Sequence, residues 1–268
     1  MQRTPRSFLF VPANRVERFS KALDAGSDAV IIDLEDAVPV DLKEEARQTL
    51  INWLEAHPEK DIMVRVNSRQ TPWFLDDISL AKYPNVSAIV LPKTESITDI
   101  EVITDIKAIN IYPLIETPIG FSQVRTIANA NHVQALMFGS IDFQLEMGMS
   151  GGFNELLYFR NEIVLASKLA GIDAPIDGVT VDIKNDELLT LEASQANNLG
   201  FSGKLCIHPL QVNIVNQVFS PSREEIEWAQ RVLKATAESK GQAISLDGKM
   251  IDLPVIRKAE QILQKSAY

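Results

Sequence analysis

The sequence predicts an α/β protein of the TIM-type (β/α)8 barrel class with a C-terminal helical extension. Eight short apolar runs alternate with longer segments of helical period, as in a parallel sheet built from βα units. The length of 268 residues suits one barrel of about 250 residues. No G-x-G-x-x-G follows the first apolar run and no P-loop is present, which disfavours a nucleotide-binding open sheet.

The expected barrel occupies residues 1–220. Its strands are the apolar runs at residues 7–12, 29–34, 62–67, 87–93, 111–116, 135–142, 178–183 and 204–209. The expected helices between them include residues 16–26, 42–56, 97–109, 155–171 and 187–200. Several of these segments end in glycine, a common helix stop, and each is long enough to return the chain to a parallel neighbour.

The expected extension occupies residues 221–268. It contains a long helical segment at residues 222–241, a less regular segment at 242–254 and a short helix at 255–267. A self-contained barrel has no need of these residues. We therefore expect the extension to cover the molecule or to contribute to a neighbouring subunit.

Composition excludes several functional classes. A net charge of −10 and dispersed basic residues make nucleic acid an unfavourable partner. Cys206 is the single cysteine, lies in an apolar run and is expected to be a buried, inert thiol. No apolar run reaches the length of a membrane span, and we expect a cytoplasmic protein without a membrane partner.

Polar residues close five of the predicted strands, where a β/α barrel carries its active site. They are Asp33, Glu35, Asp36, Arg65, Asn67, Lys93, Glu116 and Asp142. Glu116 and Asp142 end consecutive predicted strands, so their carboxylates should lie side by side. Adjacent carboxylates repel unless a proton or a cation separates them, and Mg²⁺ is commonly held by one or two carboxylates. Helix capping or pairing with arginine is the structural alternative.

Each basic candidate residue has both a functional and a structural interpretation. Arg65 has the planar fork that suits a substrate carboxylate, but an ion pair with Glu35 or Asp36 is equally compatible with its position. Lys93 has the chemistry of a Schiff-base lysine, although pairing with nearby acids is the more common role. His208 is either catalytic or a hydrogen-bonded structural residue.

Ordered segments along the whole chain resemble the citrate lyase beta subunit-like family, within the group that includes malyl-CoA and citramalyl-CoA lyases. The matching segments are RSFLFVPANR (6–15), DAVIIDLEDAV (28–38) followed by Lys43 and AR (46–47), VRVN (64–67), VLPKTES (90–96), IET (115–117), FGSID (138–142), APIDGVTVDI (174–183), GFSGKLCIHPLQV (200–212) and GKMIDLP (248–254).

The resemblance implies site residues and an assembly. It implies Mg²⁺ on Glu116 and Asp142, the keto-acid part of the substrate on Arg65, and Asp252 reaching the site of a neighbouring subunit as acid or base. We assign Arg65, Glu116 and Lys43 to substrate binding, and Asp252, Arg65 and Glu116 to catalysis. A homotrimer or hexamer is implied. Family members usually carry an acidic residue before the metal aspartate, and Ile141 replaces it here.

The expected function is Mg²⁺-dependent carbon–carbon cleavage of a 3-hydroxy carboxylic acyl-CoA thioester. Citramalyl-CoA or a citryl thioester is the first expectation and malyl-CoA the second, giving a small keto acid and an acetyl thioester. Three alternatives stay open: a metal-free Schiff-base aldolase using Lys93, a phosphoenolpyruvate-type enzyme, and a non-catalytic subunit of a larger citrate lyase complex. The sequence does not distinguish CoA from an acyl-carrier protein.

Overall fold

The structure is a computed structural model that describes residues 4–238 and 244–266. The chain divides into two compact units, one formed by residues 4–216 and one that begins at Gln217 and contains the remaining C-terminal residues.

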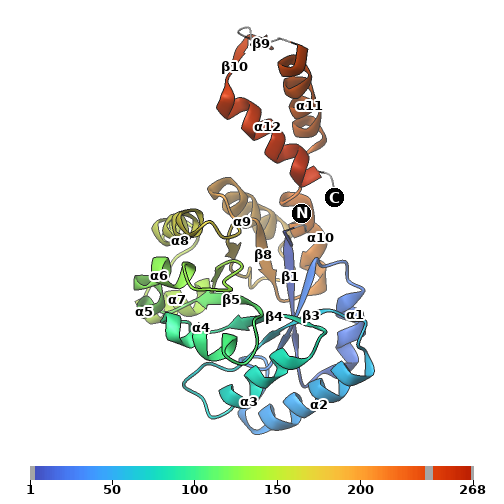
Figure 1. Ribbon diagram of the computed structural model, residues 1–268, viewed down its shortest axis with the longest axis vertical. Helices are drawn as coiled ribbons and strands as arrows, with labels where there is room; N and C mark the ends of the chain where they lie inside the picture. The colour runs from blue at the N-terminus through green and yellow to red at the C-terminus, as the bar shows by residue number, and fades with distance from the viewer. Residues whose placement is uncertain (1–3, 239–243, 267–268) are drawn as a thin grey trace. The chain divides into compact units, whose positions relative to one another are not determined.

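The first unit is a closed barrel of eight parallel strands in sequence order, as the apolar runs predict (Figure 1). Each strand pairs with the next, and the last closes on the first through pairs such as Phe8 with Leu205. The strands are β1 (Ser7–Pro12), β2 (Ala29–Asp33), β3 (Ile62–Arg65), β4 (Val86–Leu91), β5 (Asn110–Ile115), β6 (Met137–Phe138), β7 (Ile176–Asp177) and β8 (Gly203–Cys206).

Helices connect the strands and surround the barrel (Figure 1). They are η1 (Val16–Arg18), α1 (Phe19–Leu23), η2 (Val40–Leu42), α2 (Lys43–Ala56), α3 (Phe74–Ile78), η3 (Ser79–Lys82), α4 (Ile97–Thr104), α5 (Pro118–Ser122), α6 (Val124–Ala128), α7 (Ser140–Met147), α8 (Leu157–Ala170), α9 (Asp186–Leu199) and α10 (Pro209–Val218). The predicted glycine stops hold for α8 and α9, which end at Gly171 and Gly200 in the left-handed conformation.

One apolar cluster fills the barrel interior. Every strand contributes to it, through Phe8, Ile31, Met63, Ala88, Val90, Tyr112, Leu114, Met137, Ile176 and Leu205, and Ala135 joins them. The cluster is a layered core of the kind that closes a barrel of this size. Because the interior is solid, a ligand has access only to the barrel ends.

Two predicted strands are wrong in their extent. The sixth ends at Phe138, and the chain turns into α7 at Ser140, so Asp142 lies in the first turn of a helix and not at a strand end. The seventh is Ile176–Asp177, whereas residues 178–183 form no strand. Two-residue strands are too short to show a period of two in the sequence. The apolar alternation of Val179 and Val181 reflects their place in the lining of a pocket.

The C-terminal unit contains the two predicted helices and a hairpin. They are α11 (Arg223–Glu238), β9 (Ile244–Leu246), β10 (Lys249–Ile251) and α12 (Leu253–Ser266), with the two strands antiparallel. Ala229, Val232, Ile251, Ala259 and Ile262 form a separate small core. The predicted helical residues 239–241, the following residues 242–243 and residue 267 lie outside the described residues.

One expectation about a single residue is met. Cys206 is fully buried, and burial raises the pKa of its thiol to about 12, which suppresses the reactive thiolate. Within the described part of the chain, none of the helices combines the length and the apolar composition that crossing a bilayer requires.

Candidate functional site

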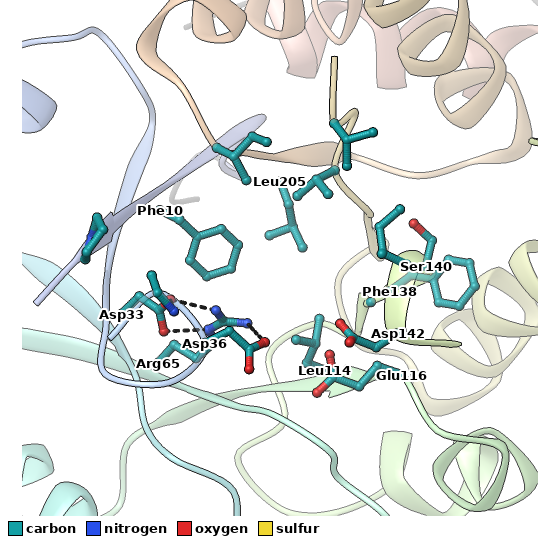
Figure 2. A pocket seen from close by; sticks show the side chains of 17 residues that line it. Phe10, Asp33, Asp36, Arg65, Leu114, Glu116, Phe138, Ser140, Asp142 and Leu205 are labelled. Atoms are coloured by element: carbon teal, nitrogen blue, oxygen red, sulfur yellow. Dashed lines mark hydrogen bonds and ion pairs between the residues drawn. The ribbon is translucent and has the colours of Figure 1, made fainter. Parts of the chain in front are cut away.

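A pocket of about 400 Å³ lies at the carboxyl ends of the barrel strands (Figure 2). Acidic residues and Arg65 occupy one part of its wall, and Phe10 and Leu205 lie across the hollow. The lining residues are Phe10, Pro12, Asp33, Asp36, Ala37, Arg65, Leu114, Glu116, Phe138, Gly139, Ser140, Ile141, Asp142, Val179, Val181, Leu205 and Ile207. Three of the five predicted site residues, Arg65, Glu116 and Asp142, therefore share one pocket.

Arg65, the last residue of β3, is surrounded by carboxylates. Its Nε and Nη2 donate to the two oxygens of Asp33 at 2.7 and 2.6 Å, a bidentate pair from the neighbouring strand β2. Its Nη1 lies 3.1 Å from Glu35 Oε2, an ion pair without hydrogen-bond alignment, and 3.7 Å from Asp36 Oδ2. Burial opposes the charge, but Asp33, Glu35 and Glu116 outweigh it and raise the pKa of Arg65 above its ordinary value. The guanidinium is thus fixed in place.

Lys93 links two acids of the site. Its backbone N–H donates to Glu116 Oε1 at 2.8 Å, and its Nζ donates to Glu35 Oε1 at 2.7 Å. The left-handed φ of 47° is uncommon for a residue with a side chain, and it directs both groups to these carboxylates. Burial works against the ammonium, but Glu35 and Glu116 outweigh it and raise the pKa of Lys93.

Glu116 and Asp142 point into the same hollow (Figure 2). Glu116 directly follows β5 and is 1% exposed, whereas Asp142 is half-buried in the first turn of α7. Burial raises the pKa of Glu116 to about 8, and the nearby carboxylates of Glu35 and Asp142 act in the same direction. Gly139 permits this packing, because a Cβ there would lie 2.5 Å from Glu116 Oε2.

The arrangement fits a hard divalent cation. Among the described residues, Asp142 has no ion-pair partner, and Glu116 has only the ammonium of Lys93 at 3.9 Å. Two carboxylates beside an open pocket match the ligand set of Mg²⁺, which keeps several water or substrate oxygens. The described residues contain no group of three or more acidic, histidine or cysteine side chains placed to hold a metal ion.

The other predicted residues, Lys43, Asp252 and His208, each bond to nearby backbone groups. The buried Nζ of Lys43 donates to the backbone oxygens of Leu34 and Glu35 at 2.8 and 2.6 Å. In the C-terminal unit, the exposed Asp252 precedes α12, and its Oδ1 accepts from the backbone N–H of Val255. His208 follows β8, and its Nδ1 accepts from Leu210 N. Neither Lys43 nor His208 is among the residues that line the pocket.

Sequence reasoning missed two features of the site. It considered Glu35 and Asp36 as partners of Arg65 but not Asp33, which forms the shortest contacts. It also read the alternation of Val179 and Val181 as a strand, whereas both residues line the pocket after β7. Their two-residue spacing was the available signal, since it places both side chains on one face of an extended segment.

Comparison with known proteins identifies relatives along the whole chain. Residues 6–209 match the family model HpcH/HpaI aldolase/citrate lyase, and residues 161–268 match a carbon–carbon bond lyase of the TIM-barrel fold. A citrate lyase subunit beta-like protein of Deinococcus radiodurans is 34% identical over 98% of this chain and 97% of its own. A (3S)-malyl-CoA thioesterase of Cereibacter sphaeroides is 33% identical, over 97% and 94% respectively.

A solved structure has the same architecture. It is protein CitE from Mycobacterium tuberculosis in complex with magnesium, acetoacetate and coenzyme A, which is 33% identical, covers 98% of both chains and has a TM-score of 0.84. The likeness covers the barrel and the C-terminal residues alike. With its closed eight-stranded barrel and its family match over most of its length, the chain belongs to the HpcH/HpaI aldolase/citrate lyase family.

Proposed function

We propose that the protein is a Mg²⁺-dependent lyase that cleaves a 3-hydroxy acyl thioester between its second and third carbons, giving a keto acid and an acetyl thioester. The observation that carries the proposal is the pair Glu116 and Asp142, set in one pocket with Arg65. The relatives support the reaction class through their names, which include citrate lyase subunit beta. Citramalyl-CoA, citryl and malyl-CoA thioesters are the candidate substrates.

Glu116 and Asp142 would hold the metal. A bound Mg²⁺ would supply positive charge that stabilises the oxygen of the hydroxyl-bearing carbon as the carbon–carbon bond breaks. Solved relatives from Mycobacterium tuberculosis are described with magnesium and pyruvate, and with magnesium and oxaloacetate. The cradle for Glu116 at Gly139 and the unpaired Asp142 are the features of this chain that support the same metal here.

Arg65 would hold the carboxylate next to the reacting carbon. Its Nε and Nη2 are committed to Asp33, which leaves Nη1 as the group available to substrate. Asp36, whose side chain is 57% exposed, is the weakest partner of Nη1 at 3.7 Å and is the one that a substrate carboxylate would replace. Fixing this end of the substrate orients the bond that breaks.

Asp252 would act as the acid or base from a neighbouring subunit of a homotrimer or hexamer. Cleavage removes the hydroxyl proton, and the electrons of the broken bond pass to the carbon beside the thioester, which must then accept a proton. An exposed carboxylate outside the barrel unit suits a shared site. Reassembled mixtures of Asp252→Ala and Glu116→Ala subunits should then regain activity that both parents lack. Failure of confirmed mixed oligomers to regain it would remove Asp252 from the mechanism.

The environment of Lys93 disfavours the Schiff-base alternative. A Schiff-base lysine needs a lowered pKa to be a free amine, whereas Glu35 and Glu116 raise the pKa of Lys93. The same interactions occupy its ammonium. Borohydride added with substrate should therefore leave the protein unmodified, and trapping on Lys93 would reverse this conclusion.

The test of the proposed function is an assay of the purified protein with citramalyl-CoA, citryl-CoA and malyl-CoA. Mass analysis of products separates carbon–carbon cleavage, which yields acetyl-CoA and a keto acid, from thioester hydrolysis, which yields free CoA. Chelation should abolish cleavage and Mg²⁺ should restore it. Activity that appears only with other citrate lyase subunits or an acyl-carrier thioester would indicate a complex subunit. Release of phosphate from a phosphorylated substrate would indicate a phosphoenolpyruvate-type enzyme.

A further inference from the structure

We propose that the pocket selects thioesters whose hydroxyl-bearing carbon carries one carboxylate and a small apolar substituent, hydrogen or methyl, and rejects those that carry a second carboxylate there. Malyl and citramalyl thioesters belong to the first class, and a citryl thioester belongs to the second. The inference rests on the proposed function and narrows its substrate.

The wall of the pocket carries an excess of negative charge. Its lining contains four carboxylates, from Asp33, Asp36, Glu116 and Asp142, and Arg65 is the single cation among the described lining residues. Two nitrogens of that guanidinium already serve Asp33. Arg65 therefore has room for one substrate carboxylate and not for two.

The nearby lysines do not supply a second cation to the pocket. Lys93 directs its ammonium to Glu35 at 2.7 Å, and Lys43 directs its ammonium to two backbone oxygens. Neither residue lines the pocket. A second carboxylate would thus find no cation beyond Arg65 and the Mg²⁺ that the reacting oxygen already engages, and an unpaired charge held away from water is strongly disfavoured.

Another part of the pocket wall is apolar. Leu114 and Leu205 belong to the barrel core, and Phe10 and Val179 pack against that core. Figure 2 shows Phe10 and Leu205 across the hollow from Asp142 and Glu116. A substituent that points away from the carboxylates therefore meets the apolar side chains of Phe10 and Leu205. Such a wall accommodates hydrogen or methyl and offers no hydrogen-bond donor to a carboxylate.

Binding of keto-acid products tests the charge argument without turnover. Calorimetry in Mg²⁺ would compare pyruvate with 2-oxobutyrate and with fresh oxaloacetate, whose substituents are methyl, ethyl and carboxymethyl. The ethyl compound controls for size. We expect oxaloacetate to bind at least about 10-fold more weakly than 2-oxobutyrate, since a missing polar partner costs more than an added methylene. Equal or tighter binding of oxaloacetate overturns the inference.

The rates of thioester cleavage provide an independent test. The citramalyl or malyl thioester should have a kcat/KM at least about 10-fold above that of the citryl thioester. Equal cleavage of all three overturns the selectivity but leaves the proposed lyase intact. Absence of cleavage and of Mg²⁺-dependent keto-acid binding overturns the proposed function itself, so the two failures are distinguishable.

A cation placed on the apolar wall should reverse the preference. Val179 is only partly buried and lies outside the strands, so the barrel should tolerate Val179→Lys. We expect the ratio of citryl to citramalyl turnover to rise at least about 10-fold in this variant, because the ammonium would pair with the second carboxylate. Val179→Met, similar in length but uncharged, should leave the ratio low. An equal rise in both variants would assign the selectivity to size and overturn the charge argument.

Discussion

The barrel unit holds two clusters of buried charge that differ in their balance. In one, Asp177 of β7 lies between two cations, Arg160 of α8 at 2.8 Å and Lys204 of β8 at 2.9 Å, and all three residues are at most 5% exposed. In the other, the pocket at the strand ends, Arg65 faces several carboxylates and Asp142 has no described counter-ion. The first cluster is satisfied by the protein alone, whereas the second has an excess of negative charge.

The pKa shifts follow this balance. Burial would raise the pKa of Asp177, but Lys204 and Arg160 overcome it and lower the pKa below its usual range. For Glu116, burial and the neighbouring carboxylates act together and raise the pKa to about 8. Burial alone therefore does not mark a functional acid. A carboxylate that lacks a counter-charge beside an open pocket is the better indication of a functional acid.

The largest expected effect is the loss of metal from the second cluster. Glu116→Gln and Asp142→Asn each remove a charged ligand, so we expect Mg²⁺ affinity to fall by more than about 100-fold, beyond the loss typical of outer-shell partners. Calorimetry measures this directly. Asp177→Asn is the matched control, because it removes a buried carboxylate outside the pocket, and its folded form should retain the affinity. Unchanged affinity in both pocket variants would contradict the metal assignment.

The next effect is on stability and should appear in the first cluster. Asp177→Asn leaves Arg160 and Lys204 buried without their shared partner, so the free energy of unfolding should fall by about 3–5 kcal/mol. Glu116→Gln should not destabilise the metal-free protein, because it relieves repulsion from Glu35 and Asp142. Denaturant unfolding compares the two. A similar loss in both variants would mean that the clusters do not differ as described.

A smaller effect is expected at Arg65. Arg65→Lys keeps the positive charge but cannot pair with both oxygens of Asp33 while also reaching substrate. We expect kcat/KM to fall by about 10–100-fold through misplacement of the substrate. Steady-state kinetics with retained Mg²⁺ affinity would locate the defect in substrate binding. Wild-type kinetics would leave Arg65 with a purely structural role.

The last effect is the pH dependence of stability, whose sign should differ between the clusters. Glu116 has a folded pKa of about 8 against an ordinary 4.5, so its contribution is complete below 4.5 and is lost as pH rises toward 8. Asp177 has a lowered pKa, so its contribution is present above the ordinary carboxyl range and is lost as pH falls. Unfolding of metal-free wild type, Glu116→Gln and Asp177→Asn across pH separates the two. If the loss of stability toward pH 8 disappeared in Asp177→Asn and persisted in Glu116→Gln, its assignment to Glu116 would be contradicted.

The sequence predicts the barrel because most of its strands are apolar over four or more residues. The runs around β1 to β5 and β8 are long enough to identify, whereas β6 and β7, with two residues each, gain their pairing from their neighbours. Strand ends also predict Arg65 and Glu116 correctly as pocket residues. The partner of Arg65 was not predictable, because Asp33 lies 32 residues away and three acids compete for one guanidinium. The buried contacts of Lys43 likewise depend on how α2 packs.

The position of Asp142 on a helix has a mechanical consequence. Glu116 is anchored by the barrel wall, but Asp142 moves with α7, which the rings of Phe121, Phe138 and Phe159 hold at Phe143. A cation shared by the two carboxylates would cross-link this helix to the barrel. Metal occupancy would then also set how freely α7 fluctuates, and with it how long the rim of the pocket around Ile141 keeps a single shape.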